Sequence, residues 1–465
     1  MSNVGVKGNP LGVAPIGGLV RKFAVPSIIA MLVGAVYNIV DQIFIGQFVG
    51  TLGNAATNIA FPLTISCVAI SLLCGIGAAS NFNLAMGRGE TSDAAYFIGN
   101  GVATCVCVGV ILLICTQLFM EGMLNAFGST PDVLPYAVEY VRVVSFGFPF
   151  LILTTAGGHV IRADGSPRIA MICNLSGAIL NVGLDALFVI VFGMGMTGAA
   201  LATIIGQIIS AIIVISYLRR YKTVALNAKH FAVKLHYLTK IVSLGCASMV
   251  NQIAMMVNQI ALNNALKIYG AMSPYGSEIP LACAGVTIKV AQLFFAVVIG
   301  ISQGSQPILG FNYGAKNYSR VREAFFVAIK AGAAISIVAF IIFQLTPRSI
   351  VAIFGTGSEA YFEFGERFIR IYLFGICINF MQPISATFFT SIGKAYKGLF
   401  LSLTRQIIFL LPLILILPTF FGIDGLLFAG PVADALSFIC AIIMVIIEFR
   451  SIKKLEISVN SGNAA

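Results

Sequence analysis

The chain has 465 residues, of which 58% are hydrophobic and only 10% are charged, and its mean hydropathy is +0.97. Soluble domains carry about 25% charged residues, so this composition excludes a water-soluble enzyme and indicates an integral membrane protein. A formal charge of +11 would suggest a nucleic-acid partner in a soluble chain. Here we expect no such partner, because the positions of the charges along the chain explain the excess.

Twelve apolar stretches follow one another along the chain, and each is long enough to cross a bilayer core as a helix. The N-terminus lacks the pattern of a removable signal peptide, so the first stretch is expected to stay in the membrane. The ten cysteines lie in apolar stretches without a CxxC pair, which argues against a disulfide or metal framework. The predicted spans lie near 16–46, 52–82, 94–120, 133–158, 168–192, 196–218, 237–268, 281–308, 319–344, 360–389, 397–420 and 425–449.

Lysine and arginine set the orientation of the spans. With the N-terminus in the cytoplasm, most of the 28 Lys and Arg residues fall in cytoplasmic segments, Arg405 among them. The even number of spans then places the C-terminus in the cytoplasm too. We therefore expect a multi-pass protein of the cell membrane whose surroundings are the lipid bilayer.

The two halves of the sequence resemble each other. Three matches occur in the same order with similar offsets: GIGAASNFNLAMGRG (75–89) with GISQGSQPILGFNYG (300–314), GMTGAALA (195–202) with GIDGLLFA (422–429), and Asn38 with Asn258. Six spans per half keep both halves in the same orientation, as in parallel transporter repeats. The alternative is that glycine-rich membrane helices look alike by chance.

The repeat predicts the domain organisation. We expect an N-terminal six-helix bundle over residues 1–218, a cytoplasmic linker over 219–236, and a C-terminal six-helix bundle with a short cytoplasmic tail over 237–465. The fold class is thus an all-α membrane protein with two homologous bundles.

Two acidic residues inside predicted spans are the strongest candidates for chemistry, since a charge at the centre of a membrane helix costs about 3 kcal/mol or more. Asp41 follows Asn38 by three residues on the first span, and Asp185 follows Asn181 by four residues on the fifth. Thr203 on the sixth span can add a hydroxyl. Alternatively, each aspartate is a buried polar group that is satisfied by asparagine or by the backbone.

The carboxyl pair has two chemical uses that the residues alone leave open. Burial and a neighbouring carboxylate favour binding of a proton, with the pair titrating as a unit. Carboxylate, amide and hydroxyl oxygens also suit a hard cation, so Na⁺ at Asp41, Asn181, Asp185 and Thr203 is the other use.

Several further residues could line a cavity between the halves. Methionine and aromatic side chains suit a site that accepts varied apolar shapes, and Lys289 lies deep in a predicted span. The candidates for a substrate cavity are Met255, Met256, Lys289 and Phe294. Asp434, whose repeat partner is Gln207, is a further carboxyl candidate inside the membrane.

Enzyme motifs are missing from the chain: it has no P-loop, no HExxH and no GxSxG with plausible partners. A chain without an ATP-binding domain can transport only on an ion gradient or down a gradient. We therefore expect a transporter that is not an enzyme.

The residues AVPS (24–27) and YNIVDQIFIG (37–46), the AMGRG end of span two, the IRADGSPR loop (161–168) and the N-x-x-x-D of span five resemble the multidrug and toxic compound extrusion (MATE) family. The resemblance covers about residues 15–450. It implies a V-shaped pair of bundles around a central cavity, and multidrug efflux by antiport of organic, often cationic compounds against H⁺ or Na⁺. It implies no cofactor beyond that ion and suggests a monomer that confers antibiotic resistance. The cation role falls on Asp41, Asn181, Asp185 and Thr203.

The sequence departs from family members that use acidic residues in the C-terminal half. Span seven reads MVNQIAMMVNQIALNN without an acid, and Glu363 and Glu366 lie at the outer start of span ten. This concentrates the expected cation site in the N-terminal half. The alternative function is a flippase for lipid-linked sugar or lipid precursors, which typically has more Arg and Lys in its cavity; here only Lys289 is deep.

Overall fold

A computed structural model describes residues 9–354 and 358–462 of the chain, apart from the side chains of a few residues in 42–54, of Phe354 and of those after 457. Twelve of its helical segments are long and apolar enough to cross a membrane, and each overlaps one predicted span. The helices in chain order are α1 (Pro10–Val13), α2 (Ile16–Phe48), α3 (Thr51–Arg88), α4 (Thr91–Ala126), α5 (Leu134–Val144), η1 (Ser145–Gly147), α6 (Phe148–Ala163), α7 (Pro167–Asp185), η2 (Ala186–Val191), α8 (Gly195–Leu218), η3 (Ala228–Phe231), α9 (Leu235–Ala271), α10 (Glu278–Gly314), α11 (Tyr318–Leu345), α12 (Pro347–Phe354), α13 (Glu359–Tyr372), α14 (Ile376–Asn379), α15 (Met381–Ser391), α16 (Ala395–Leu403), η4 (Thr404–Leu410), α17 (Leu411–Phe421) and α18 (Ile423–Gly462).

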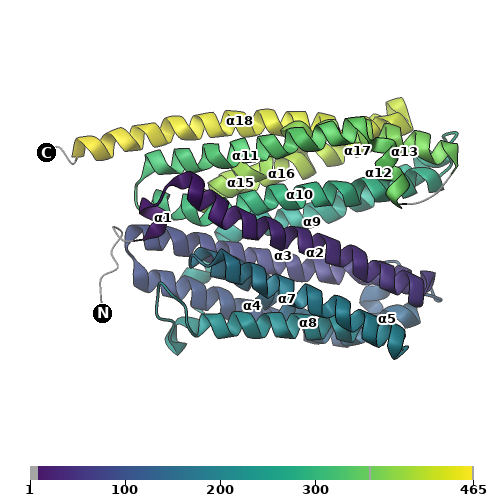
Figure 1. Ribbon diagram of the computed structural model, residues 1–465, viewed down its shortest axis with the longest axis horizontal. Coiled ribbons are helices and arrows are strands. Elements are labelled where there is room, and N and C mark those ends of the chain that lie inside the picture. The colour runs from purple at the N-terminus through teal and green to yellow at the C-terminus, as the bar shows by residue number, and fades with distance from the viewer. Residues whose placement is uncertain (1–8, 355–357, 463–465) are drawn as a thin grey trace.

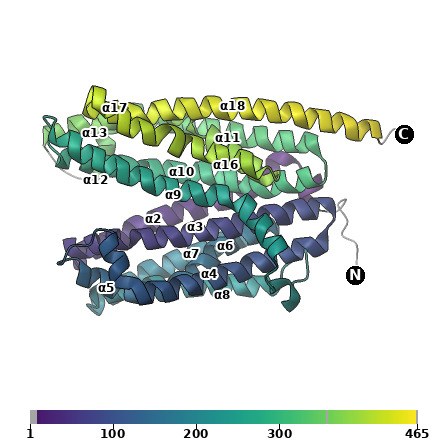
Figure 2. The same cartoon turned by 180° about the vertical axis from the view of Figure 1, so that it is seen from behind.

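The helices form two lobes that lie side by side. In both views α2 to α8 make up one lobe, the N-lobe, and α9 to α18 make up the other, the C-lobe (Figures 1 and 2). The short helix α1 and the C-terminal part of α18 lie at the same end of the molecule, here named the α1 end (Figure 1). Each lobe has a cluster of buried apolar side chains of its own, which explains why each half can form a bundle. A larger cluster joins α1 and the start of α2 to α10 and α11 across the two lobes.

Contacts between the lobes are close at the α1 end. Gly300 and Gly304 of α10 pack on the backbone of α2 at Ile28 and Ala24, where a Cβ atom would lie within 2.6 Å of the facing Cα atoms. Small residues of this kind let membrane helices approach closely. Polar contacts join the same region: the side-chain amide of Gln306 donates to Ser80 Oγ (2.8 Å). The lobes are therefore held together where α3 and α10 end and α2 begins.

The structure repeats its own geometry in the two lobes. Gly147 of η1 packs against the side chain of Gln207 on α8, and Gly375 packs against the side chain of Asp434 on α18. A π-helix follows in corresponding spans, as η2 after α7 and as η4 after α16. The predicted pairing of Gln207 with Asp434 thus corresponds to equivalent packing positions, as expected for two homologous bundles.

One predicted position is wrong. Arg405 does not belong to a segment outside the membrane: it lies on η4 inside the eleventh span, Ala395–Phe421, with a side chain that is only 13% exposed. Its guanidinium contacts the carboxylate of Asp434 on α18. A buried acid on another helix compensates its charge, which the local sequence around Arg405 does not reveal.

The segment between α8 and α9 is anchored on the N-lobe by a buried acid. Asp164, in the turn between α6 and α7, accepts hydrogen bonds from the Tyr217 hydroxyl (2.6 Å), the Lys222 backbone amide (2.8 Å), and the Thr223 amide (3.0 Å) and hydroxyl (2.6 Å). Its side chain is 3% exposed. Burial raises the pKa of Asp164 above its ordinary value of 3.8, although these four hydrogen bonds act in the opposite direction.

This acid predicts a pH dependence of stability. Because the folded-state pKa of Asp164 is raised, the folded chain binds a proton more tightly than the unfolded chain, and this contribution is lost as the pH rises from about 4 through the raised pKa. The stability of the wild type relative to Asp164→Asn should therefore fall over that range. Thermal unfolding midpoints of both proteins in detergent, measured at steps of pH, test this; a difference that rises with pH would contradict it.

Candidate functional site

The candidate cation site lies inside the N-lobe, where α2, α7 and α8 meet. Gly177 of α7 and Gly206 of α8 bring these helices into close contact, since a Cβ on Gly206 would lie 2.7 Å from the Gly177 carbonyl oxygen. This close approach lets the Asn181 amide donate to the Thr203 hydroxyl across the two helices (3.2 Å). Both side chains are buried.

The two predicted carboxyl groups come together from different helices. Asp185 ends α7, directly before the π-helix η2, and is fully buried. Its carboxyl group adjoins that of Asp41, which extends from the second half of α2. The structure thus brings together Asp41, Asn181, Asp185 and Thr203, four of the five residues that the sequence singles out for this site.

Several oxygen atoms of this group are buried without a hydrogen-bond donor. They are Asp41 Oδ1, Asn181 Oδ1 and both carboxylate oxygens of Asp185. Two adjoining carboxylates cannot both stay charged and unpartnered in a buried place, because burial penalises the charge and the two charges repel. A proton or a cation would satisfy both conditions. Among the described residues no group of three or more His, Cys, Asp or Glu side chains gathers as a transition-metal site would require.

Asn38 does not join the group. Its side chain is exposed, and its amide donates to the Gly34 carbonyl oxygen of its own helix (2.8 Å). Two tyrosines that sequence reasoning missed lie beside the carboxyl groups instead. Tyr37 of α2 adjoins Thr203, and Tyr140 of α5 lies within electrostatic range of both aspartates. Tyr37 precedes Asp41 by four residues, so its helical spacing could have found it; no local pattern identifies Tyr140.

The predicted cavity residues lie in the C-lobe and differ in their exposure. Met255 of α9 is 40% exposed, and Met256 and Lys289 are half-buried. Phe294 of α10 is buried in the apolar core and packs on Phe295 with ring centroids 5.4 Å apart. The structure therefore gives Phe294 a packing role in place of the predicted lining role.

A second buried polar group lies in the C-lobe. The carboxylate of Asp434 accepts hydrogen bonds from Arg405 Nε (2.6 Å) and from the Asn379 amide (2.9 Å), and the guanidinium lies over the ring of Phe295. The N-lobe equivalent of Asp434 is the neutral Gln207. The interior of the C-lobe therefore carries a paired charge, whereas Asp41 and Asp185 of the N-lobe have no basic partner among the described residues.

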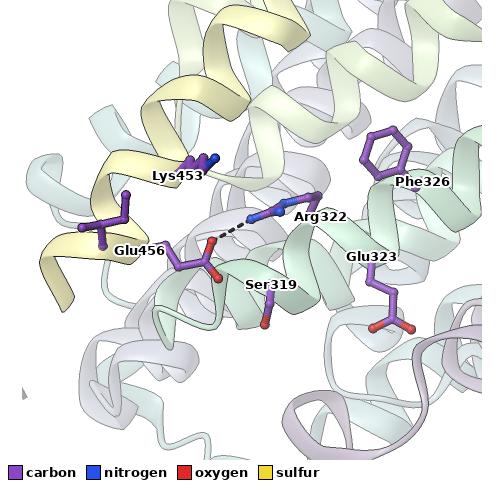
Figure 3. A pocket seen from close by; sticks show the side chains of 7 residues that line it. Ser319, Arg322, Glu323, Phe326, Lys453 and Glu456 are labelled. Carbon is purple, nitrogen blue, oxygen red and sulfur yellow. Dashed lines mark hydrogen bonds and ion pairs between the residues drawn. The ribbon is translucent and has the colours of Figure 1, made fainter. Parts of the chain in front are cut away.

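A pocket of about 410 Å³ lies elsewhere, between α11 and the C-terminal part of α18 (Figure 3). Arg322 and Glu456 form an ion pair of 2.6 Å across it. Its lining carries both signs of charge, with Glu323 and Lys453 beside this pair. The pocket is at the α1 end of the C-lobe and is separate from the buried carboxyl groups.

Comparison with known proteins agrees with this architecture. The sequence profile of the MatE family matches residues 26–187 and 248–416. The multidrug export protein MepA of Staphylococcus haemolyticus (strain JCSC1435) is 23% identical over 440 residues, which are 94% of each chain. MepA of Staphylococcus aureus (strain N315) is 22% identical over 433 residues, 93% of this chain and 94% of the relative.

Solved structures share the fold. An outward-facing multidrug resistance MATE family transporter of the MOP superfamily superposes with a TM-score of 0.89 at 20% identity, over 98% of this chain and all of the other. The likeness confirms the predicted fold class: an all-α membrane protein whose twelve spans form two six-helix bundles in a V-shaped arrangement.

Proposed function

The chain belongs to the MatE family, and on that premise we propose that it exports organic compounds, many of them cationic, by antiport against H⁺ or Na⁺. Members of this family are transporters, so the chain is a multi-pass membrane transporter and not an enzyme. The curated relatives are multidrug export proteins. We extend that activity to this chain.

One observation carries the coupling part of the proposal: buried carboxylate and amide oxygens of Asp41, Asn181 and Asp185 lack hydrogen-bond donors. A coupling ion has to bind reversibly where charge compensation is incomplete. An adjoining pair of acids with an amide and the Thr203 hydroxyl offers such a place to a proton or to Na⁺. We propose that the bound ion and the exported compound favour different conformations, which is the only way that binding can shift a conformational equilibrium.

The arrangement of the lobes supports alternating access. The α1 end, where Gly300 and Gly304 hold α10 on α2, carries most of the Lys and Arg residues, and we propose that it faces the cytoplasm, with both termini on that side. Closure at this end leaves the opposite end as the route to the outside. We propose that a monomer in the cell membrane suffices, since the buried apolar clusters within and between the lobes are formed by one chain.

Transport in proteoliposomes tests the proposal. The purified protein is reconstituted, the cationic dye tetramethylrhodamine methyl ester is added outside, and a pH gradient and a Na⁺ gradient are imposed in separate experiments. We expect dye accumulation against its gradient with at least one of the two ions, and the productive gradient identifies the coupling ion. If the dye accumulates under neither of the two gradients, antiport against H⁺ or Na⁺ is contradicted. Gradient-independent scrambling of a fluorescent polyprenyl phosphate would favour the flippase alternative.

A further inference from the structure

Lys289 lies far inside the membrane and on the side of α10 that faces the N-lobe. It is the twelfth residue of α10, which begins at Glu278. Eleven residues, close to three full turns of helix, separate it from Gly300, so both residues lie on the same face. Gly300 packs on Ile28 of α2, and Lys289 therefore projects toward the space between the lobes.

The helix register places Lys289 at the depth of the carboxyl pair. Helices α2 and α10 run antiparallel, with Gly304 on Ala24 and Gly300 on Ile28. The same register sets Lys289 level with Ile39 of α2, within one turn of Asp41. Asp41 follows Ile28 by thirteen residues, about three and a half turns of helix. Its side chain therefore lies on the face of α2 opposite Ile28, away from α10 and toward the N-lobe. The ammonium group and the acid thus share a depth but face different spaces.

None of the described acids at this depth pairs with Lys289. Asp41 adjoins Asp185, and Asp434 is bound by Arg405 (2.6 Å) and Asn379 (2.9 Å). In the part of the chain that the structure describes, the half-buried ammonium group of Lys289 makes no ion pair or hydrogen bond. A half-buried charge inside a membrane protein is costly unless a counter-charge or water compensates it. An anionic ligand is the partner that this position lacks.

We propose that Lys289 binds the carboxylate of those exported organic compounds that carry one, and that it thereby sets how well they are exported. This proposal rests on the export function proposed above and specifies its substrates. The ligand would lie between the lobes, with its anionic group toward α10 and its remaining surface against side chains such as Met255. Methionine adapts to varied apolar shapes, while the ammonium group selects for charge.

Two dyes that differ at one group separate charge recognition from transport in general. Tetramethylrhodamine carries a carboxylate, and its methyl ester carries none. Export of both is measured in proteoliposomes for the wild type, Lys289→Gln, Lys289→Arg and the control Lys330→Gln, which alters an exposed lysine on α11. We expect Lys289→Gln to lower export of the carboxylate dye by about tenfold or more relative to the ester. Lys289→Arg should retain it, and Lys330→Gln should change neither dye.

The outcomes decide between this proposal and the one on which it rests. Wild-type export of the ester without the carboxylate dye would overturn the role of Lys289 and leave the export function intact. An equal effect of Lys289→Gln on both dyes, or none on either, would also overturn it, since a lysine that only packs or reaches the lipid surface does not distinguish them. Export of neither dye by the wild type would overturn both proposals. Unchanged ester export by the variant shows that it folds.

Discussion

Replacing Asp185 by asparagine is expected to lower gradient-driven export by at least about tenfold. A tenfold loss lies in the lower range of coupling free energies between sites. The variant keeps the size of the side chain and removes the titratable charge from the buried pair. Asparagine also costs less to bury than a carboxylate, so the thermal unfolding midpoint should stay the same or rise. Dye accumulation under imposed pH and Na⁺ gradients measures the loss, and unfolding in detergent shows that the fold is kept.

The same reasoning applies to Asp41→Asn, because the two carboxyl groups adjoin each other and act as one unit. The matched control is Glu121→Gln, the same kind of change at an exposed acid near the end of α4. It should leave export unchanged. Full gradient-driven export by Asp41→Asn and Asp185→Asn would show that this site does not bind the coupling ion. A loss in Glu121→Gln as large as theirs would point to a general effect of removing acids.

Hydropathy and helix periodicity were sufficient to predict the spans and to single out Asp41 and Asp185 as acids inside them. Length and composition alone were enough to predict the twelve spans, since a helix needs about 20 apolar residues to cross a bilayer core. Asn181 and Asp185 could be placed on one face because four residues make about one turn. The rarity of acids inside apolar spans singled out Asp41 and Asp185, and the family resemblance implied their common role.

Long-range packing explains what the sequence could not predict. In the sequence, Arg405 looks like a residue at the membrane border, because the basic residues Lys394 and Lys397 precede it by about ten residues. Its true partner, Asp434, is 29 residues away on α18. The amide of Asn38 bonds within its own helix although its spacing from Asp41 suits the site. Phe294 packs in the core, because an aromatic residue at this spacing fits a core and a cavity equally well.

Removing the guanidinium of Arg405 is expected to lower the free energy of unfolding by about 3–5 kcal/mol, because Arg405→Met leaves the buried carboxylate of Asp434 without its counter-charge. Asp434 is 3% exposed, and of its two partners only Arg405 carries charge. Exchanging both Arg405 and Asp434 for apolar residues removes the cost of burying the two ions as well as their attraction. Arg405→Met/Asp434→Leu should therefore recover most of the lost stability. Chemical denaturation in detergent of the wild type, both single variants and the double variant gives this cycle.

An exposed pair provides the comparison that makes this result specific. Arg348 and Glu359 also form an ion pair at 2.9 Å, but their side chains are 54% and 74% exposed. Water screens such a pair, so Arg348→Met should cost less than about 1 kcal/mol. Equal losses at Arg348 and Arg405 would mean that burial does not govern the effect. If the double variant is no more stable than Arg405→Met, the loss comes from missing contacts of the arginine, such as its position over the Phe295 ring, and not from an uncompensated carboxylate.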